Sequence, residues 1–436
     1  MPNPGPSKGS IKVNGLGVVS YNKVGGITAA QINEEVSGIY EVFNGGEAAQ
    51  PFGPSLGATN GVKFFRLKYN TTIPENNRTY RVSGLLAIPN VEDSTQLPLL
   101  SWQHGTVLLP QEAPSRLVKK DELREFASFK RSALGPPRSA ETLFNVARMA
   151  GNGYILAAAD YIGNGISRDA PQAYAVKEAT QQTTFDMITA SKAVLGELGI
   201  STGPLFLNGW SQGGLNTQWL SDKLQSENIQ VERQASVSGP TDLAQTLSYW
   251  FNDYPGTPNW LTAVVPLQLG AWQKYYGMKN LMANAIRPEY LETSKQIFRK
   301  EIDWDDKEIY VEAAKNGTGL LGLPLKPEDM LQRDFITNFN NGVGAYYNRA
   351  VKNTALTIEY DEQSRFYGGG DDNIVPEFLS IEAPVEYQES LGSDLATGIS
   401  VGEKADHRSA FLGSLFGSAS DPSNNLLDWF NSALSV

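Results

Sequence analysis

Residues 204–214 have the sequence PLFLNGWSQGG, in which an apolar run leads directly into the G-x-S-x-G motif of residues 209–213. The apolar run predicts a strand, and the stretch after the motif predicts a helix. If Ser211 is a nucleophile, the motif requires this arrangement, with the serine at the apex of a sharp turn between strand and helix. Glycine on both sides of such a turn avoids a clash between a Cβ atom and the crowded backbone. The segment therefore predicts a nucleophile turn in an α/β fold, the alternative being a glycine-rich turn without chemistry.

Apolar strands alternate with amphipathic helices on both sides of this turn. We expect strands at 97–103, 154–159, 205–207 and 231–237 and helices at 141–150, 177–198 and 212–224. This alternation is typical of a mostly parallel sheet that is covered by helices on both faces. Before it come an expected antiparallel strand pair, at 62–73 and 80–88, and a helix at 28–43 that opens with a capping box of Thr28 and Gln31.

The alternation stops near residue 243 and resumes with a strand at 355–360, a helix at 385–391 and a strand at 395–401. The segment between looks helical, and its first part is dense in aromatic residues. At roughly 100 residues it is too long for a simple loop. We expect an inserted, mostly helical cap at 243–354 and an α/β core at 61–242 and 355–436. Residues 1–60 are expected to form a helical and extended segment that packs on the core.

The base that a serine nucleophile needs is usually an imidazole, and the chain contains two histidines. His407 follows the last expected strand. In the chain order serine, acid, histidine, the base lies on the loop after that strand. We therefore expect His407 to be the base, the alternative being a histidine of the core or surface without a catalytic role.

The acid should lie between Ser211 and His407, after a strand. Asp372 lies in the segment YGGGDDNIVP at 367–376, and its carboxylate would accept the imidazole N–H and fix the tautomer. Asp371 is the near rival. Asp242 is a third candidate, for which helix capping is the alternative role. Asp406 adjoins His407, but adjacent side chains rarely point at each other, so we do not expect it to orient the imidazole.

The oxyanion hole needs two amides, one from the residue after the nucleophile and one from an earlier turn. Gln212 is the first of these, and Thr106 or Gly105, in the segment QHGT at 103–106, is the second. Such amides stabilise the negative charge of the tetrahedral intermediate. His104 comes too early in the chain to be the base, and we expect it to brace this loop by hydrogen bonding. A histidine of a surface turn is the alternative.

Four side chains are candidates for contact with a substrate: His104, Tyr161, Trp210 and Trp250. Tyr161 lies in DYIGNG at 160–165, which lines a pocket floor or holds a turn. Trp210 shapes the nucleophile turn or its packing. Trp250 and the other cap aromatics line an acyl or aryl pocket or form the core of the cap.

Composition excludes several classes of function. A formal net charge of −11 without a long basic run argues against binding to nucleic acid or to anionic lipid. The chain has no cysteine, which excludes disulfides, a thiol nucleophile and a cysteine metal site. No stretch reaches the roughly 18 apolar residues of a membrane span, and we expect a soluble protein. Residues 1–10 contain no apolar signal region, so either the chain is not exported by that route or a signal has been replaced; the compartment stays open.

The motifs together resemble those of the α/β-hydrolase superfamily. The similarity runs from about residue 62 to the C-terminus and rests on the segments at 103–106, 160–163, 209–214 and 369–376 and on His407. The chain looks most like the secretory-lipase and esterase branch. That resemblance implies the α/β-hydrolase fold and a serine carboxylesterase that forms an acyl-enzyme through Ser211, His407 and Asp372, without a metal or other cofactor.

The sequence also departs from related families. The oxyanion turn is HGT and not HGGG, the chain is far longer than cutinases and lacks their cysteines, and Trp210 stands where tannases have a cysteine. A small-molecule ester is the expected substrate. A serine peptidase, a thioesterase, an acyltransferase and a non-catalytic binding member of the fold are the alternatives. Acyl and alcohol specificity and oligomeric state stay open.

Overall fold

The computed structural model describes residues 6–44, 51–91, 96–109, 112–118 and 139–434. Across these ranges the strands form one ten-stranded sheet in the order β1-β2-β3-β4-β6-β5-β7-β8-β9-β10. From β5 onward the neighbouring strands are parallel, and β1 to β4 form an antiparallel extension that joins at β6. The strand bounds are β1 Lys8–Val13, β2 Gly17–Ile27, β3 Val62–Ile73, β4 Arg78–Pro89, β5 Leu97–Gln103, β6 Ile155–Ala159, β7 Thr202–Trp210, β8 Arg233–Val237, β9 Gln363–Gly368 and β10 Ala396–Ser400.

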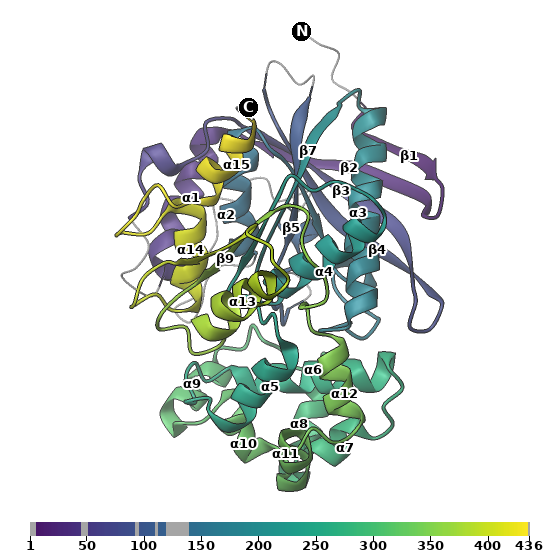
Figure 1. Cartoon of the computed structure of the whole chain (residues 1–436). Coiled ribbons are helices and arrows are strands. Elements are labelled where there is room, and N and C mark those ends of the chain that lie inside the picture. Colours follow the sequence, from purple (N-terminus) through teal and green to yellow (C-terminus); the bar gives the residue numbers. More distant parts are fainter. Residues whose placement is uncertain (1–5, 45–50, 92–95, 110–111, 119–138, 435–436) are drawn as a thin grey trace.

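Helices cover both faces of this sheet, as the alternation of strands and helices predicted (Figure 1). One apolar core lies between the sheet and α1 (Ala29–Asn44), α2 (Ala140–Arg148), α14 (His407–Phe416) and α15 (Leu426–Leu434). A second lies on the other face, under α3 (Lys177–Glu197) and α4 (Gln212–Ser226), and continues among the helices that follow β8. The α/β fold class is therefore confirmed. None of the described helices is long and apolar enough to cross a membrane.

The N-terminal segment contributes more to the sheet than the sequence indicated. β1 and β2 form a hairpin that pairs with β3, and Val19 and Tyr21 of β2 are buried. The predicted helix follows as α1. Its capping box is present, with Thr28 N–H donating to Gln31 Oε1 (3.0 Å) and Gln31 N–H donating to Thr28 Oγ1 (3.2 Å).

Helices α5 to α12 lie between β8 and β9 in the chain and form a layer of their own beyond one end of the strands, at the bottom of the view (Figure 1). We call this layer the cap. Its helices are α5 Leu243–Asn252, α6 Leu261–Tyr275, α7 Leu281–Ala285, α8 Pro288–Arg299, α9 Glu308–Asn316, α10 Pro327–Met330, α11 Arg333–Asn340 and α12 Ala345–Lys352.

The chain returns from the cap to the core without the strand predicted at 355–360. That prediction was wrong: the segment turns, with Thr357 N–H donating to Ala355 O (3.0 Å), and the strand is β9, three residues later. The alternation of Leu356, Ile358 and Tyr360 with polar residues gave the segment its strand-like pattern. The helix predicted at 385–391 is present as α13 (Ala383–Ser390).

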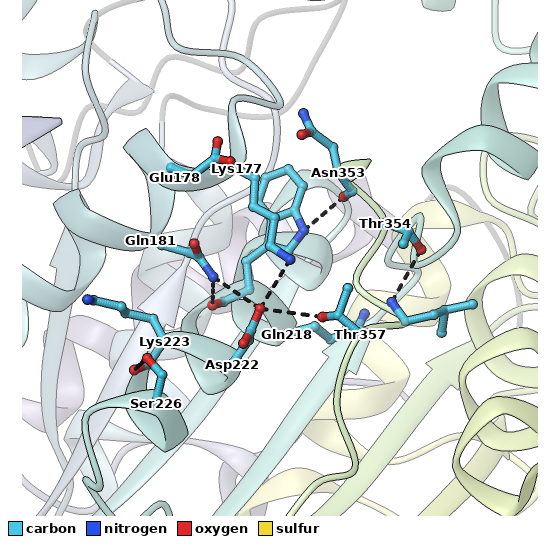
Figure 2. A network of polar contacts seen from close by, with 12 residues as sticks. Lys177, Glu178, Gln181, Gln218, Asp222, Lys223, Ser226, Asn353, Thr354 and Thr357 are labelled. Atoms are coloured by element: carbon cyan, nitrogen blue, oxygen red, sulfur yellow. Dashed lines mark hydrogen bonds and ion pairs between the residues drawn. The ribbon is translucent and has the colours of Figure 1, made fainter. Parts of the chain in front are cut away.

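A polar network fixes this return segment to α3 and α4 (Figure 2). The Trp219 indole donates to Asn353 O (3.0 Å), and Thr357 Oγ1 donates to Asp222 (3.4 Å). Lys177 of α3 pairs with the same Asp222 carboxylate at 3.1 Å. One end of the cap is thus anchored to two core helices.

Candidate active site

The predicted sharp turn is present between β7 and α4. Ser211 has φ 59° and ψ −123°, a strained conformation for a residue with a side chain, and its N–H donates to Val237 O (2.8 Å). A Cβ atom on Gly213 would lie 1.9 Å from Gln103 O, and one on Gly209 would lie 2.1 Å from Gly213 O. Backbone crowding therefore requires both glycines of the motif.

His407 and Asp372 meet from two segments that are distant in the chain. His407 is the first residue of α14, and its Nδ1 lies 2.7 Å from Asp372 Oδ2, with the histidine side chain 8% exposed and the aspartate 0%. The other carboxylate oxygen accepts the N–H groups of Ile374 (2.9 Å) and Val375 (3.0 Å). These three hydrogen bonds fix the orientation of the carboxylate and of the imidazole.

The other candidate acids have different roles. Asp371 is exposed. Asp242 caps α5 by accepting Gln245 N–H (3.0 Å), its alternative role in the sequence analysis. Asp406 caps α14 by accepting Arg408 N–H (3.1 Å) and Ser409 N–H (2.8 Å). Of the candidates, Asp372 therefore contacts the imidazole.

The second ring nitrogen of His407, Nε2, is on the side of the ring opposite the bond to Asp372. In the neutral tautomer whose Nδ1–H donates to Asp372, Nε2 carries the lone pair. Nε2 is buried and has no hydrogen-bond partner within the described ranges, Ser211 Oγ included. The ring is held beside the turn by Trp210, whose Nε1 donates to His407 O (3.0 Å) and whose ring centroid lies 5.1 Å from that of the histidine. Bonds between nucleophile and base are often incomplete in ligand-free enzymes and tighten when substrate binds.

Gly105 and Thr106, the two candidates for the second amide of the oxyanion hole, differ in whether their backbone N–H is free. Gly105 N–H donates to the Glu141 carboxylate (2.9 Å), so this amide is already occupied. Burial raises the pKa of Glu141 to about 8. The amides of Thr106 and Gln212 have no acceptor among the residues that the structure describes, and both residues line the same cavity. Glu141 was not predicted from the sequence, because a glutamate in the first turn of a helix is usually a surface residue.

Three of the four predicted substrate contacts lie behind the site, and none of them lines the cavity. The rings of His104 and Tyr161 stack with their centroids 4.0 Å apart, and the Tyr161 hydroxyl donates to His104 O (3.1 Å). His104 Nδ1 lies 2.8 Å from Gly105 O, and burial lowers the pKa of this imidazole, which favours its neutral form. Trp210 stacks on Phe411 at 4.8 Å. All three side chains buttress the two turns on which Ser211 and Thr106 lie.

A cavity opens at Ser211 between core and cap and encloses about 510 Å³, its open mouth included. Trp250, the fourth predicted contact, lines it and donates its indole N–H to Ile374 O (2.8 Å). The wall is mostly apolar. Its lining residues are Thr106, Tyr174, Ala175, Ser211, Gln212, Leu215, Pro240, Leu243, Leu247, Trp250, Trp260, Leu261, Val264, Gln268, Ile374 and Val375.

No protein-family model matches the sequence, and no curated protein matches it significantly. Solved structures resemble the fold. A proposed hydrolase from Legionella pneumophila has a TM-score of 0.72 at 18% identity, over 95% of this chain and 97% of that one. The rice cell wall degrading esterase LipA from Xanthomonas oryzae has a TM-score of 0.67 at 19% identity, over 95% of both chains. Candida antarctica lipase A has 0.54 at 16% identity, over 79% of this chain and 73% of that one. The chain thus has the α/β-hydrolase fold.

Proposed function

We propose that this chain, which has the α/β-hydrolase fold, is a carboxylic ester hydrolase that forms an acyl-enzyme on Ser211. The observation that carries the proposal is the buried bond of 2.7 Å between His407 and Asp372, together with a strained serine that lines an apolar cavity. A strained nucleophile turn, an oriented imidazole and an acid behind it together support nucleophilic catalysis.

In the proposed reaction, His407 Nε2 takes the proton of Ser211 as Oγ attacks the ester carbonyl carbon. The amides of Gln212 and Thr106 donate to the developing oxyanion. Collapse of the tetrahedral intermediate breaks the bond to the alcohol, which leaves with the proton held by His407. Water, deprotonated by the same nitrogen, then releases the acid and restores Ser211. Asp372 stays ionised and stabilises the imidazolium throughout.

The wall of the cavity favours an apolar group on the substrate. Leu215, Leu247, Trp260 and Val264 offer hydrophobic surface. Among the residues that the structure describes, no lysine or arginine that would bind an anionic substrate lines the cavity. Solved structures with the same fold include an esterase and a lipase, which supports ester hydrolysis over peptide hydrolysis.

The test compares p-nitrophenyl esters with p-nitroanilide amides in the wild type, Ser211→Ala and Ser191→Ala. Ser191 is buried in α3, outside the site, and serves as the matched control. We expect hydrolysis of the esters and not of the amides, a loss of at least about 10⁴-fold in kcat for Ser211→Ala, and no loss for the control. Ester turnover that survives in folded Ser211→Ala would refute the nucleophile. Turnover of the amides alone would indicate a peptidase.

A further inference from the structure

One helix of the cap presents a polar side chain to the cavity from an otherwise apolar face. Leu261, Val264 and Gln268 of α6 are spaced three and four residues apart, so they lie on one side of the helix, and all three line the cavity. Gln268 is 2% exposed. Buried glutamine is costly unless its amide is paired, so its presence at this position requires a reason.

Half of this amide is paired and the other half is not. The Tyr346 hydroxyl donates to Gln268 Oε1 (2.7 Å). Burial raises the pKa of Tyr346, which keeps this hydroxyl protonated and able to donate. Gln268 Nε2 is buried without a hydrogen-bond partner among the residues that the structure describes. An unpaired buried donor costs free energy, and a group that occupies the cavity beside it can supply the missing acceptor.

The packing around Tyr346 fixes the direction of the amide. The tyrosine ring packs against three aromatic rings of the cap. The distances between ring centroids are 4.9 Å to Phe335, 5.0 Å to Trp272 and 5.6 Å to Phe339. Because Oε1 is held by this hydroxyl, the two N–H bonds of Nε2 stay unpaired on a residue that lines the cavity. A side chain oriented in this way can distinguish ligands that accept a hydrogen bond from those that do not.

The acyl group of an ester substrate suits this cavity better than the alcohol group does. During the proposed reaction it stays attached to Ser211 while the alcohol leaves and water enters through the mouth. A cavity closed on one side by α6 therefore suits the group that remains.

We propose that Gln268 donates a hydrogen bond to an oxygen atom within the acyl chain, which makes the enzyme selective for apolar acyl groups that carry one ether, keto or hydroxyl oxygen. This inference rests on the proposed function. A plain alkyl chain would fill the apolar part of the cavity and leave Nε2 unpaired, and that difference is the source of the selectivity.

The test uses pairs of p-nitrophenyl esters of equal chain length. In one member of each pair a methylene is replaced by an ether oxygen, at successive positions starting from the fourth chain atom, where intrinsic ester reactivity is unaffected. We expect the wild type to favour the ether at one position by roughly tenfold or more in kcat/KM. In Gln268→Met, which keeps the volume and removes the amide, this preference should fall to about 1.

Further variants separate selectivity from folding. Gln268→Met combined with Tyr346→Phe removes both hydrogen-bonding partners and so avoids a buried orphan hydroxyl in the cap. Tyr346→Phe alone frees the amide to rotate and should reduce the preference. Tyr347→Phe, on the same helix but without a bond to Gln268, should keep the wild-type ratio.

Two kinds of failure can be told apart. If hydrolysis depends on Ser211 but no pair differs in the wild type, or the preference persists in folded Gln268→Met, this inference is overturned and the proposed function stands. If ester turnover does not depend on Ser211, the proposed function fails and this inference with it.

Discussion

Two adjacent aspartates show at the scale of a residue how environment decides chemistry. Asp371 is exposed, whereas Asp372 is buried, accepts two amides and holds His407. We expect Asp372→Asn to lower kcat by roughly 10³–10⁴-fold with a smaller change in KM, because the amide stabilises the wrong imidazole tautomer. Asp371→Asn is the matched control and should retain wild-type kinetics. Equal effects of the two variants on kcat would contradict the assignment.

Glu141 predicts a dependence of stability on pH. Burial raises its pKa from 4.5 to about 8, so between these pH values the folded state binds more protons than the unfolded state. The contribution of this group is therefore fully present below about pH 4.5 and is lost as the pH rises to about 8, by up to about 1.4 kcal/mol for each pH unit.

Glu141→Gln lacks this titration and still offers an oxygen to Gly105 N–H. We expect the free energy of unfolding of Glu141→Gln, measured by urea denaturation, to rise relative to that of the wild type as the pH is raised from 5 to 8. Glu362, whose pKa burial raises to about 7, titrates in both proteins and cancels in the difference. The exposed Glu359→Gln is the control and should run parallel to the wild type. A constant difference between Glu141→Gln and the wild type would show that Glu141 does not titrate in this range.

The sequence was enough to predict Ser211, His407 and Asp372 as the candidate catalytic residues, because the serine motif, the chain order and the presence of only two histidines restrict the choice. It could not nominate Glu141 or Gln268. Their importance comes from burial and from one hydrogen bond each, and both depend on segments distant in the chain. Nor could it separate Gly105 from Thr106, because the difference between them is whether the amide is already occupied.

At the scale of elements, the turn between β7 and α4 depends on close backbone contact. We expect Gly213→Ala to destabilise the fold by about 1–3 kcal/mol and to lower activity, because its Cβ atom would press on the carbonyl of Gln103 and displace the turn. Gly196→Ala is the control: Gly196 lies in α3, a Cβ atom added there would meet no other atom within 4 Å, and alanine should stabilise the helix by about 0.5–1 kcal/mol. Thermal unfolding of both variants gives the comparison, and a neutral Gly213→Ala would contradict this account of the turn.

Elements with a strong local signal were predicted well and elements defined by their neighbours were not. The capping box and apolar face of α1 and the long β3–β4 pair carry their own patterns. The β1–β2 hairpin was missed because β1 alternates between exposed and half-buried residues and depends on pairing with β2. Residues 355–360 alternate apolar and polar side chains but form the turning return from the cap, where no neighbouring strand pairs with them among the described residues.

At the scale of the whole molecule, the cap is tied to the core at several places. Lys300, at the end of α8, donates through Nζ to three core carbonyls, those of Gly163 (2.6 Å), Arg168 (2.7 Å) and Ala170 (2.7 Å). Trp272 and Tyr275 of α6 donate to Ala175 O (2.8 Å) and Pro171 O (2.7 Å). The cavity wall is therefore held by contacts between two layers that are distant in the chain.

These ties predict that cap and core unfold together. We expect Lys300→Met to lower the free energy of unfolding by about 1–3 kcal/mol within a single transition, because three carbonyl groups lose a charged donor. Lys295→Met, which removes an exposed ion pair with Glu292 on the same helix, should change it by less than about 0.5 kcal/mol. Calorimetry with two separate transitions, or no loss in Lys300→Met, would contradict a firmly attached cap.

The most direct measurement of the central claim is covalent labelling with a fluorophosphonate, followed by peptide mass spectrometry. The reagent reacts with a serine that is activated by a neighbouring base, so it reports the nucleophile without knowledge of the substrate. We expect one adduct per chain, on the peptide that contains Ser211, absent in Ser211→Ala and formed far more slowly in His407→Ala. An adduct on another residue, or no adduct in a protein that still hydrolyses esters, would contradict the account.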